Sequence, residues 1–343
     1  MFAVSEITEK KKWEDFVLSQ THTIFLQSPQ YAEFYKKLGE QSWIFGVFDA
    51  KKLVGGALAV TVHAKRGSFL FLPYGPIVNE EKNYHEALQA LTIHLADFAK
   101  KQNLDFLKIS PFWENNPSNQ NLFKQLKYKN APMHVLAQNT WLLDLGPSED
   151  DLLTGMEKTH RYLIRRCLKE GVTVSQTSEP QKLIDFNQLH DLTARRHKFH
   201  RFSDEYIQAE YDCFSPRKEA ILFKGILPDG RLDSAAVIIF YGNMAAYRHG
   251  ASANLDHKLP TSYLVQWEAI KEAKRRGFSW YNFWGIAPPE ADKKHPFYGI
   301  THFKKGFGGF NLDLLHCQDL PVTKKYYFNW LVETFRSLRR GFK

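Results

Sequence analysis

The sequence predicts a mixed α/β protein built from two successive copies of one unit. In each copy a β-hairpin is followed by a third strand, an amphipathic helix and a closing strand. Two observations support this fold class. The chain has 343 residues, of which 43% are hydrophobic and 15% aromatic, enough for two well-filled cores. The same order of strand and helix patterns also occurs twice along the chain.

The first copy is expected between residues 43 and 109. Its elements are strands 43–48, 53–62 and 69–78, helix 84–101 and strand 106–109. The charged turn Asp49-Ala50-Lys51-Lys52 between two apolar runs predicts the hairpin. Pro73-Tyr74-Gly75-Pro76 interrupts the third strand, and the helix carries apolar residues at helical spacing.

The second copy is expected between residues 220 and 284. Its elements are strands 220–226 and 234–241, a strand from 245 that leads into 249–252, helix 263–276 and strand 280–284. Leu227-Pro228-Asp229-Gly230 predicts the hairpin turn, and Gly277 the end of the helix. Gly75 and Gly250 occupy equivalent places between the third strand and the helix, which indicates a duplication.

A β-meander followed by a helix and a strand is the core of the GNAT acyltransferase fold. Acetyl-CoA enzymes of this fold hold the pyrophosphate at a helix N-terminus through a Gln/Arg-x-x-Gly-x-Gly/Ala loop. The sequence has no good copy of that loop, since Arg248-His249-Gly250-Ala251-Ser252 has a different spacing. Two acyltransferase-like halves without this loop indicate a different acyl donor.

The charge of the chain favours a polyanionic partner. There are 46 basic and 37 acidic residues, a net charge of +9. Such a surface attracts nucleic acid, anionic lipid or a phosphorylated small molecule. The basic residues gather in two stretches: Arg161, Arg165, Arg166, Lys169, Arg195, Arg196, Lys198 and Arg201, and then Lys304, Lys305, Lys324 and Lys325.

Other features indicate a cytoplasmic protein without a metal. No apolar run is long enough to span a bilayer, and the N-terminal residues lack the apolar stretch of a signal peptide. Three widely spaced cysteines, Cys167, Cys213 and Cys317, argue against a disulfide framework. His197 and His200 have no further ligand at metal spacing.

Several short runs are similar to the FemABX aminoacyltransferases, which build the peptide bridge of bacterial peptidoglycan. The resemblance extends over essentially the whole chain and rests on the runs 25–31, 74–76, 161–166 before Gly171-Val172, 247–252, 280–285 and 303–308. The resemblance implies two tandem GNAT-like domains without an inserted coiled-coil arm. It places the first at 1–145, completed by the C-terminal segment 311–343, and the second at 146–310.

The resemblance also implies an activity in cell wall biogenesis and cell shape. An amino acid would pass from aminoacyl-tRNA to a stem-peptide amine of a peptidoglycan precursor, either lipid II or UDP-MurNAc-pentapeptide. No cofactor and no metal would be needed. An aminoacyl ester is already activated, so the protein must mainly position the reactants and stabilise the developing oxyanion. No Ser-His-Asp or Cys-His arrangement is then required, and none is evident.

Lys304 is the candidate catalytic residue, because it matches the family's lysine after phenylalanine. Its ammonium would bind the tRNA end and stabilise the oxyanion. Phe303 and Lys305 flank it as candidate substrate-binding residues. The glycines that follow, Gly306, Gly308 and Gly309, would let the backbone approach a ligand closely, or would form a flexible loop without a ligand. A solvated lysine in a basic loop is the alternative.

The remaining candidates are expected to bind substrate. Arg196, or its neighbour Arg195, lies where the family has a phosphate-contacting arginine. Lys36 is a second phosphate candidate, although the family's lysine falls at Tyr35. The last two candidates are Tyr247, as a cavity residue, and Tyr74.

Two carboxylates common in relatives are replaced here by Ser110 and Asn282. An Asp at the first position would be able to accept the proton of the incoming amine. Two alternatives to the aminoacyltransferase therefore stay open. One is an acyl-CoA-type N-acyltransferase, and the other is a non-catalytic basic module that binds nucleic acid or lipid.

The C-terminal segment 324–343 has six basic residues and one acidic residue, with apolar residues spaced as one helical face. Such a helix can lie on an anionic membrane, here the inner membrane surface, which would suit a lipid-linked acceptor. The favoured alternative is a helix packed on the first domain with its basic face in water.

Overall fold

The computed structural model describes residues 2–64, 67–79, 83–197, 199–293, 295 and 297–340. Lys198 and residues 341–343 thus lie outside the described residues. The chain forms two compact units, Met1–Asn139 with Leu312–Lys343, and Thr140–Asn311. The first boundary precedes the expected one at 145 because Leu142 and Leu143 pair with Asn282 and Tyr281 in the second sheet.

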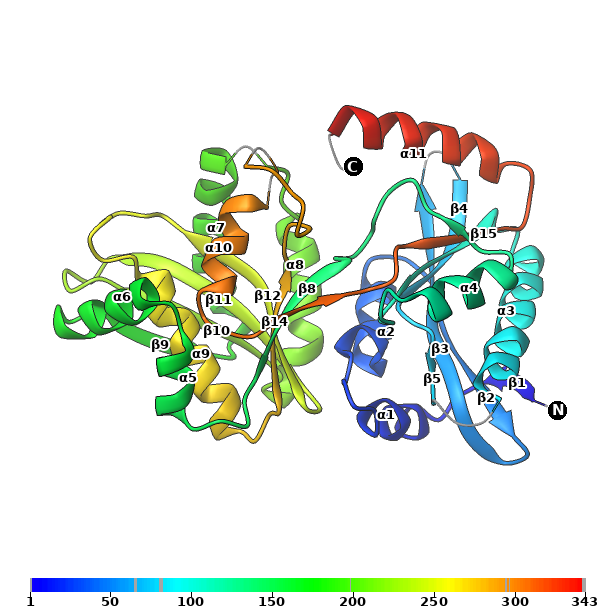
Figure 1. Cartoon of the computed structure of the whole chain (residues 1–343), viewed down its shortest axis with the longest axis horizontal. Coiled ribbons are helices and arrows are strands. Elements are labelled where there is room, and N and C mark those ends of the chain that lie inside the picture. Colours follow the sequence, from blue (N-terminus) through cyan, green and yellow to red (C-terminus); the bar gives the residue numbers. More distant parts are fainter. Residues whose placement is uncertain are drawn as a thin grey trace. The chain divides into compact units, whose positions relative to one another are not determined.

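The first unit is an eight-stranded sheet with helices, and the C-terminal segment returns to it (Figure 1). The strand order is β1-β2-β3-β4-β6-β15-β7, with β5 paired to β3. Leu88, Leu91 and Leu95 of α3 are buried against the sheet. Its elements are β1 (Ala3–Glu6), α1 (Lys10–Leu18), α2 (Pro29–Lys37), β2 (Ser42–Asp49), β3 (Lys52–Ala64), β4 (Gly67–Tyr74), β5 (Ile77–Val78), α3 (Tyr84–Lys101), β6 (Phe106–Pro111), α4 (Pro117–Gln125), β7 (Lys129–Asn130), β15 (Gln318–Pro321) and α11 (Tyr326–Arg340).

The second unit is a seven-stranded sheet of order β14-β8-β13-β12-β11-β10-β9. Leu264, Trp267 and Ile270 of α9 pack into its core. Its elements are β8 (Asn139–Asp144), α5 (Glu149–Gly155), α6 (Lys158–Lys169), β9 (Thr173–Thr177), α7 (Leu183–His197), α8 (Asp204–Phe214), β10 (Ala220–Ile226), β11 (Leu232–Tyr241), β12 (Met244–Ser252), α9 (Thr261–Arg275), β13 (Trp280–Gly285), α10 (Tyr298–Lys305) and β14 (Phe310–Asp313).

The two units repeat one topology, which confirms the predicted fold class. Each has a β-meander whose last strand pairs in parallel with the strand after the helix, β4 with β6 and β12 with β13. Phe69 pairs with Phe106 in the first, and Met244 with Trp280 in the second. The described residues between β13 and α10 contain no helix, so no coiled-coil arm is inserted there.

The units differ at the end of this parallel pair. In the first unit β4 and β6 stay paired through Tyr74 and Pro111. In the second unit the pairing of β12 with β13 ends at Ala246 and Asn282, although both strands continue. The two strands therefore part inside the second sheet, and beyond these residues their backbone groups no longer pair with each other.

The C-terminal helix α11 corrects one expectation. It belongs to the first unit, as favoured, but the side that it buries is polar. Tyr326, Asn329 and Glu333 are buried, whereas Phe328 and Phe335 are exposed. Glu333 lies 3.2 Å from the buried ammonium of Lys108, and this pairing turns the polar side inward.

Candidate active site

Lys304 occupies the parting between β12 and β13. Its ammonium donates a hydrogen bond of 2.6 Å to the carbonyl of Gly285, at the end of β13. The same ammonium lies 5.8 Å from the centre of the Tyr247 ring, on β12. Tyr247 directly follows Ala246, the last residue of β12 that pairs with β13. The Lys304 ammonium thus contacts both strands, called here the β12 and β13 branches, just beyond the point where they stop pairing with each other.

The expected flexible loop around Lys304 is wrong, because the residue lies in the last turn of helix α10. Close packing and backbone conformation, rather than flexibility, require glycine at the positions that follow Lys304. A Cβ at Gly306 would overlap the His160 ring, and one at Gly309 would overlap the Leu142 carbonyl. Gly308 and Gly309 have φ angles of +86° and +98°, which favour glycine. The run is therefore a closely packed helix end.

Irregularities in both strands cause the parting. The β11–β12 register shifts between Val237 and Ile238, so that Arg248 is the extra residue of a bulge. On the other branch the β13–β8 register shifts between Asn282 and Gly285, and Trp284 has a φ angle of +67°. Bulges bend strands and redirect side chains, so the two branches diverge at the level of Lys304.

Burial gives the Lys304 ammonium an unusual acidity. The residue is 7% exposed, and desolvation lowers the pKa of its amine to about 7. Within the described residues no carboxylate forms an ion pair with it. Among these residues its positive charge thus meets a carbonyl and a ring but no opposite charge, and an incoming anion or developing oxyanion would be strongly attracted.

An aromatic cluster holds α10 in place. The ring of Phe303 lies 5.1 Å from that of Tyr263 and 5.2 Å from that of Phe307. The carbonyl of Phe303 lies 2.9 Å from Nε2 of His160 on α6. Phe303 therefore fixes the helix that carries Lys304, and its half-buried ring is packed in this cluster.

A buried ion-pair network supports the β12 branch. Glu210 of α8 lies 3.0 Å from the Arg248 guanidinium and 3.0 Å from Nε2 of His249. Arg248 in turn lies over the Trp284 ring, 5.2 Å from its centre. The neighbouring Arg248 charge and the hydrogen bond from His249 outweigh burial and lower the pKa of Glu210 to about 2. The ionised carboxylate only accepts, so His249 donates its Nε2–H.

The other predicted residues of the second unit have contacts outside the point where β12 and β13 part. Lys305 places its ammonium 5.2 Å from the centre of the Trp141 ring. Arg196, at the end of α7, donates to the carbonyl of Ala253 and to Oγ of Ser252, at 2.8 and 2.9 Å. Arg195 is exposed beside it. Ser252 is five residues beyond Tyr247, or about 17 Å along an extended strand.

Lys36 and Tyr74 belong to the first unit. Lys36 is exposed on α2, where its ammonium lies 3.2 Å from Glu33. Tyr74 is buried at the end of β4, and its hydroxyl donates to the carbonyl of Ala137 at 2.8 Å. The structure thus gives each of these side chains a contact within its own unit.

The two replaced carboxylates have structural partners. The side-chain oxygen of Asn282 accepts hydrogen bonds from Thr140 and from the backbone N–H of Trp284, at 2.6 and 2.7 Å. Asn282 therefore holds the bulged β13. Ser110 donates to Sγ of Cys317 at 3.4 Å. Sequence reasoning did not include Glu210, Arg248 and Trp284 in the site, because their roles depend on burial and on a strand bulge.

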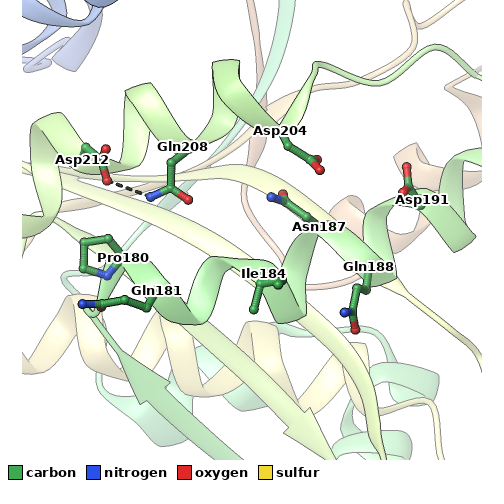
Figure 2. A pocket seen from close by; sticks show the side chains of 9 residues that line it. All are labelled: Pro180, Gln181, Ile184, Asn187, Gln188, Asp191, Asp204, Gln208 and Asp212. Carbon is green, nitrogen blue, oxygen red and sulfur yellow. Dashed lines mark hydrogen bonds between the residues drawn. The ribbon is translucent and has the colours of Figure 1, made fainter.

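A pocket of about 580 Å³ lies elsewhere in the second unit, between α7 and α8 (Figure 2). Asp191, Asp204 and Asp212 line it together with amide side chains, and Gln208 donates to Asp212. Arg201 pairs with Asp191 and Asp204. The pocket contains none of the predicted site residues. In the described part of the chain, no group of three or more His, Cys, Asp or Glu could hold a metal.

The chain consists of two tandem GNAT-like units, and in the second unit a buried lysine lies where two strands separate. These features define an acyltransferase-type fold. The FemAB family profile matches residues 8–224 and 231–334, so the chain belongs to the FemAB family. A lipid II:glycine glycyltransferase of Staphylococcus epidermidis is 22% identical over 86% of this chain and 87% of its own length. The enzyme of the same name from Staphylococcus aureus is 23% identical over 66% of this chain and 70% of its own. The family thus includes enzymes that transfer an aminoacyl group.

Solved structures agree on the fold. The crystal structure of FemX superposes with a TM-score of 0.85, at 21% identity, and covers 96% of this chain and 100% of its own. A tandem GNAT protein from the clavulanic acid biosynthesis pathway has a TM-score of 0.56 at 10% identity, over 94% and 99% of the two chains. At these identities the likeness concerns the fold alone.

Proposed function

We propose that the protein transfers an amino acid from aminoacyl-tRNA to the stem-peptide amine of a peptidoglycan precursor, forming an interpeptide bridge. The observation that carries the proposal is the Lys304 ammonium, buried where β12 and β13 part and paired with no carboxylate in the part of the chain that the structure describes. Membership of a family that contains lipid II:glycine glycyltransferases supports lipid II as the acceptor. A lipid-linked acceptor would bring the protein to the cytoplasmic face of the membrane.

The proposed reaction needs little from the protein beyond this cation. The stem-peptide amine attacks the ester carbonyl, a C–N bond forms, and the ester C–O bond to the tRNA ribose breaks. The amine loses one proton overall, and the departing ribose oxygen gains one and becomes a hydroxyl. Lys304 would stabilise the oxyanion of the tetrahedral intermediate. With a pKa of about 7, its ammonium could also give a proton to the departing ribose oxygen.

Helix α6 supports a polynucleotide donor. Lys158, Arg165 and Lys169 are exposed along one side of it, and the helix contains no acidic residue. Like charges at this spacing destabilise a helix, but a row of phosphates would neutralise them. The helix is joined to α10, because the N–H of Glu157 donates to the carbonyl of Gly306 at 2.9 Å. The basic side of α6 and Lys304 therefore lie on two helices that are hydrogen-bonded at their ends.

The mass of the acceptor before and after the reaction tests the proposed activity. We expect the purified protein, given a pool of charged tRNAs and lipid II, to add the mass of one or more amino acid residues to the acceptor. UDP-MurNAc-pentapeptide in a parallel reaction distinguishes the lipid-linked from the nucleotide-linked precursor. If neither acceptor gains mass, the proposal is wrong. Turnover with acetyl-CoA instead would indicate an acyl-CoA-type enzyme.

Charge reversal on α6 is expected to weaken donor binding. Arg165→Glu/Lys169→Glu should raise the KM for aminoacyl-tRNA about tenfold or more, and flatten its salt dependence, because fewer phosphates are neutralised. The kcat should change little. Steady-state kinetics at several salt concentrations measure both quantities.

Lys182→Glu is the matched control, since Lys182 is an exposed cation of the same unit outside α6. It should leave the KM unchanged. An equal rise in KM for both variants would show a general effect of net charge, and would remove α6 from the donor site.

A further inference from the structure

We propose that one side of α11 is a docking surface for an anionic lipid membrane. Tyr327, Phe328, Leu331, Phe335 and Leu338 form this side, called here the apolar ridge. This assignment goes beyond the proposed function, because it holds whether or not the chain transfers an aminoacyl group.

The apolar ridge faces away from the core of its own unit. Phe328 is 62% exposed and Phe335 71% exposed, and the other three members are at least half exposed. Counted from Tyr327, the other four lie one, four, eight and eleven positions along the helix, so the five form one continuous side of it. A contiguous exposed patch of large apolar side chains commonly marks an interaction site.

Buried ionic contacts fix this orientation. Lys108 of β6 is 1% exposed and lies 2.9 Å from Asp319 and 3.2 Å from Glu333. Tyr326 is fully buried, and its hydroxyl lies 3.4 Å from Asp319. Turning the apolar ridge inward would separate Glu333 from Lys108 and leave buried charges unpaired, which is strongly unfavourable in proteins. The fold therefore holds the apolar ridge outward.

The charges around the apolar ridge select an anionic surface. Lys324 and Lys325 precede the helix, and Arg336 and Arg339 are exposed on it. The ammonium of Lys129 lies 5.2 Å from the centre of the Tyr327 ring. Glu333, the one acidic residue of the helix, is turned inward. Exposed aromatic and aliphatic side chains among cations are typical of helices that lie in the headgroup region of anionic bilayers.

A second copy of the chain fits this surface less well. Two apolar ridges packed against each other would bring their basic flanks together, and like charges across an interface are unfavourable. An anionic lipid surface pairs with the cations and also receives the apolar side chains. No helix among the described residues is long and apolar enough to cross a membrane, so the contact would be peripheral.

Vesicle co-sedimentation tests the proposal directly. We expect the intact protein to bind phosphatidylcholine vesicles that contain about 30% phosphatidylglycerol, and to bind pure phosphatidylcholine vesicles much more weakly. Phe328→Ser/Phe335→Ser should lower the partition coefficient about tenfold or more, since two large apolar groups no longer leave water. Arg336→Glu/Arg339→Glu should remove the preference for phosphatidylglycerol.

Ile93→Ser is the matched control, because Ile93 is 57% exposed on α3 of the same unit. It should bind vesicles like the wild type. Thermal melts of all variants establish that they fold. Absence of wild-type binding to anionic vesicles would overturn the proposal, as would equal binding by the double serine variant. A dimer in light scattering that the serine substitutions dissociate, without any vesicle binding, would assign the apolar ridge to a second copy.

Discussion

Lys304→Met is expected to lower kcat/KM for aminoacyl transfer about 10²–10³-fold, and at the same time to raise thermal stability. The loss follows because methionine removes the cation that lies where the two strands part. Methionine is an unbranched side chain of similar length, so the aromatic packing of α10 should survive. Transfer assays by mass and thermal melts measure the two effects on the same preparation.

The gain in stability has a definite sign and pH range. Burial lowers the folded-state pKa of Lys304 from 10.5 to about 7. Between about pH 7 and pH 10.5 the unfolded chain binds more protons than the folded protein, so the free energy of unfolding of the wild type rises with pH. Below about pH 7 the lysine is charged in both states, and the full cost of burying its charge destabilises the fold. At pH 6, methionine should stabilise by on the order of 1 kcal/mol, or about 2–4 °C in Tm. Activity lost together with stability would indicate unfolding instead.

The same pKa predicts a pH profile. At saturating acceptor, the wild-type kcat/KM for aminoacyl-tRNA should fall as pH rises through about 7, because the free enzyme loses the Lys304 proton. In Lys304→Arg the charge persists at every accessible pH. If this variant keeps measurable activity, its kcat/KM should not fall as pH rises through about 7. A decline at the same pH in both enzymes would assign it to another group.

Glu210→Ala is expected to destabilise the second unit by about 3–5 kcal/mol, because it leaves the buried Arg248 charge without its partner. The substitution also removes the acceptor of the His249 N–H. With Arg248 free to move, Trp284 loses the guanidinium that lies over its ring, so transfer activity should fall in the fraction that stays folded. Urea unfolding measures the stability, and single-turnover transfer the activity.

Glu268→Ala is the matched control for this substitution. Glu268 also pairs with a cation, Lys271, at 2.7 Å, but the pair is partly exposed on α9. Removing it should change stability by less than about 1 kcal/mol. The Glu210 effect should also shrink in acid: its lowered pKa stabilises the fold above pH 4.5, and this is lost as pH falls towards about 2. A Glu210 variant as mildly affected as the control would contradict the network.

Much of the fold was predictable because its signals are local. The apolar spacing of residues 84–101 predicted helix α3 with the same ends, and the run 220–226 predicted β10. Hairpin turns and helix ends depend on neighbouring residues in the chain, so the repeated order of elements could be read directly. The candidate Lys304 came from a short motif, but its helical setting was missed, because the glycines after it were interpreted as a loop, either close to a ligand or flexible.

The sequence by itself determined the order of the elements within the two copies, the duplication and the family. Only the tertiary structure decided where the charges of the candidate site are buried and which side of α11 faces out. Lys108 and Glu333 are 225 positions apart, and helical spacing alone does not indicate that they meet. Likewise, the lowered pKa of Lys304 arises from burial where β12 and β13 part, because desolvation depends on everything packed around a group and not on its neighbours in the chain.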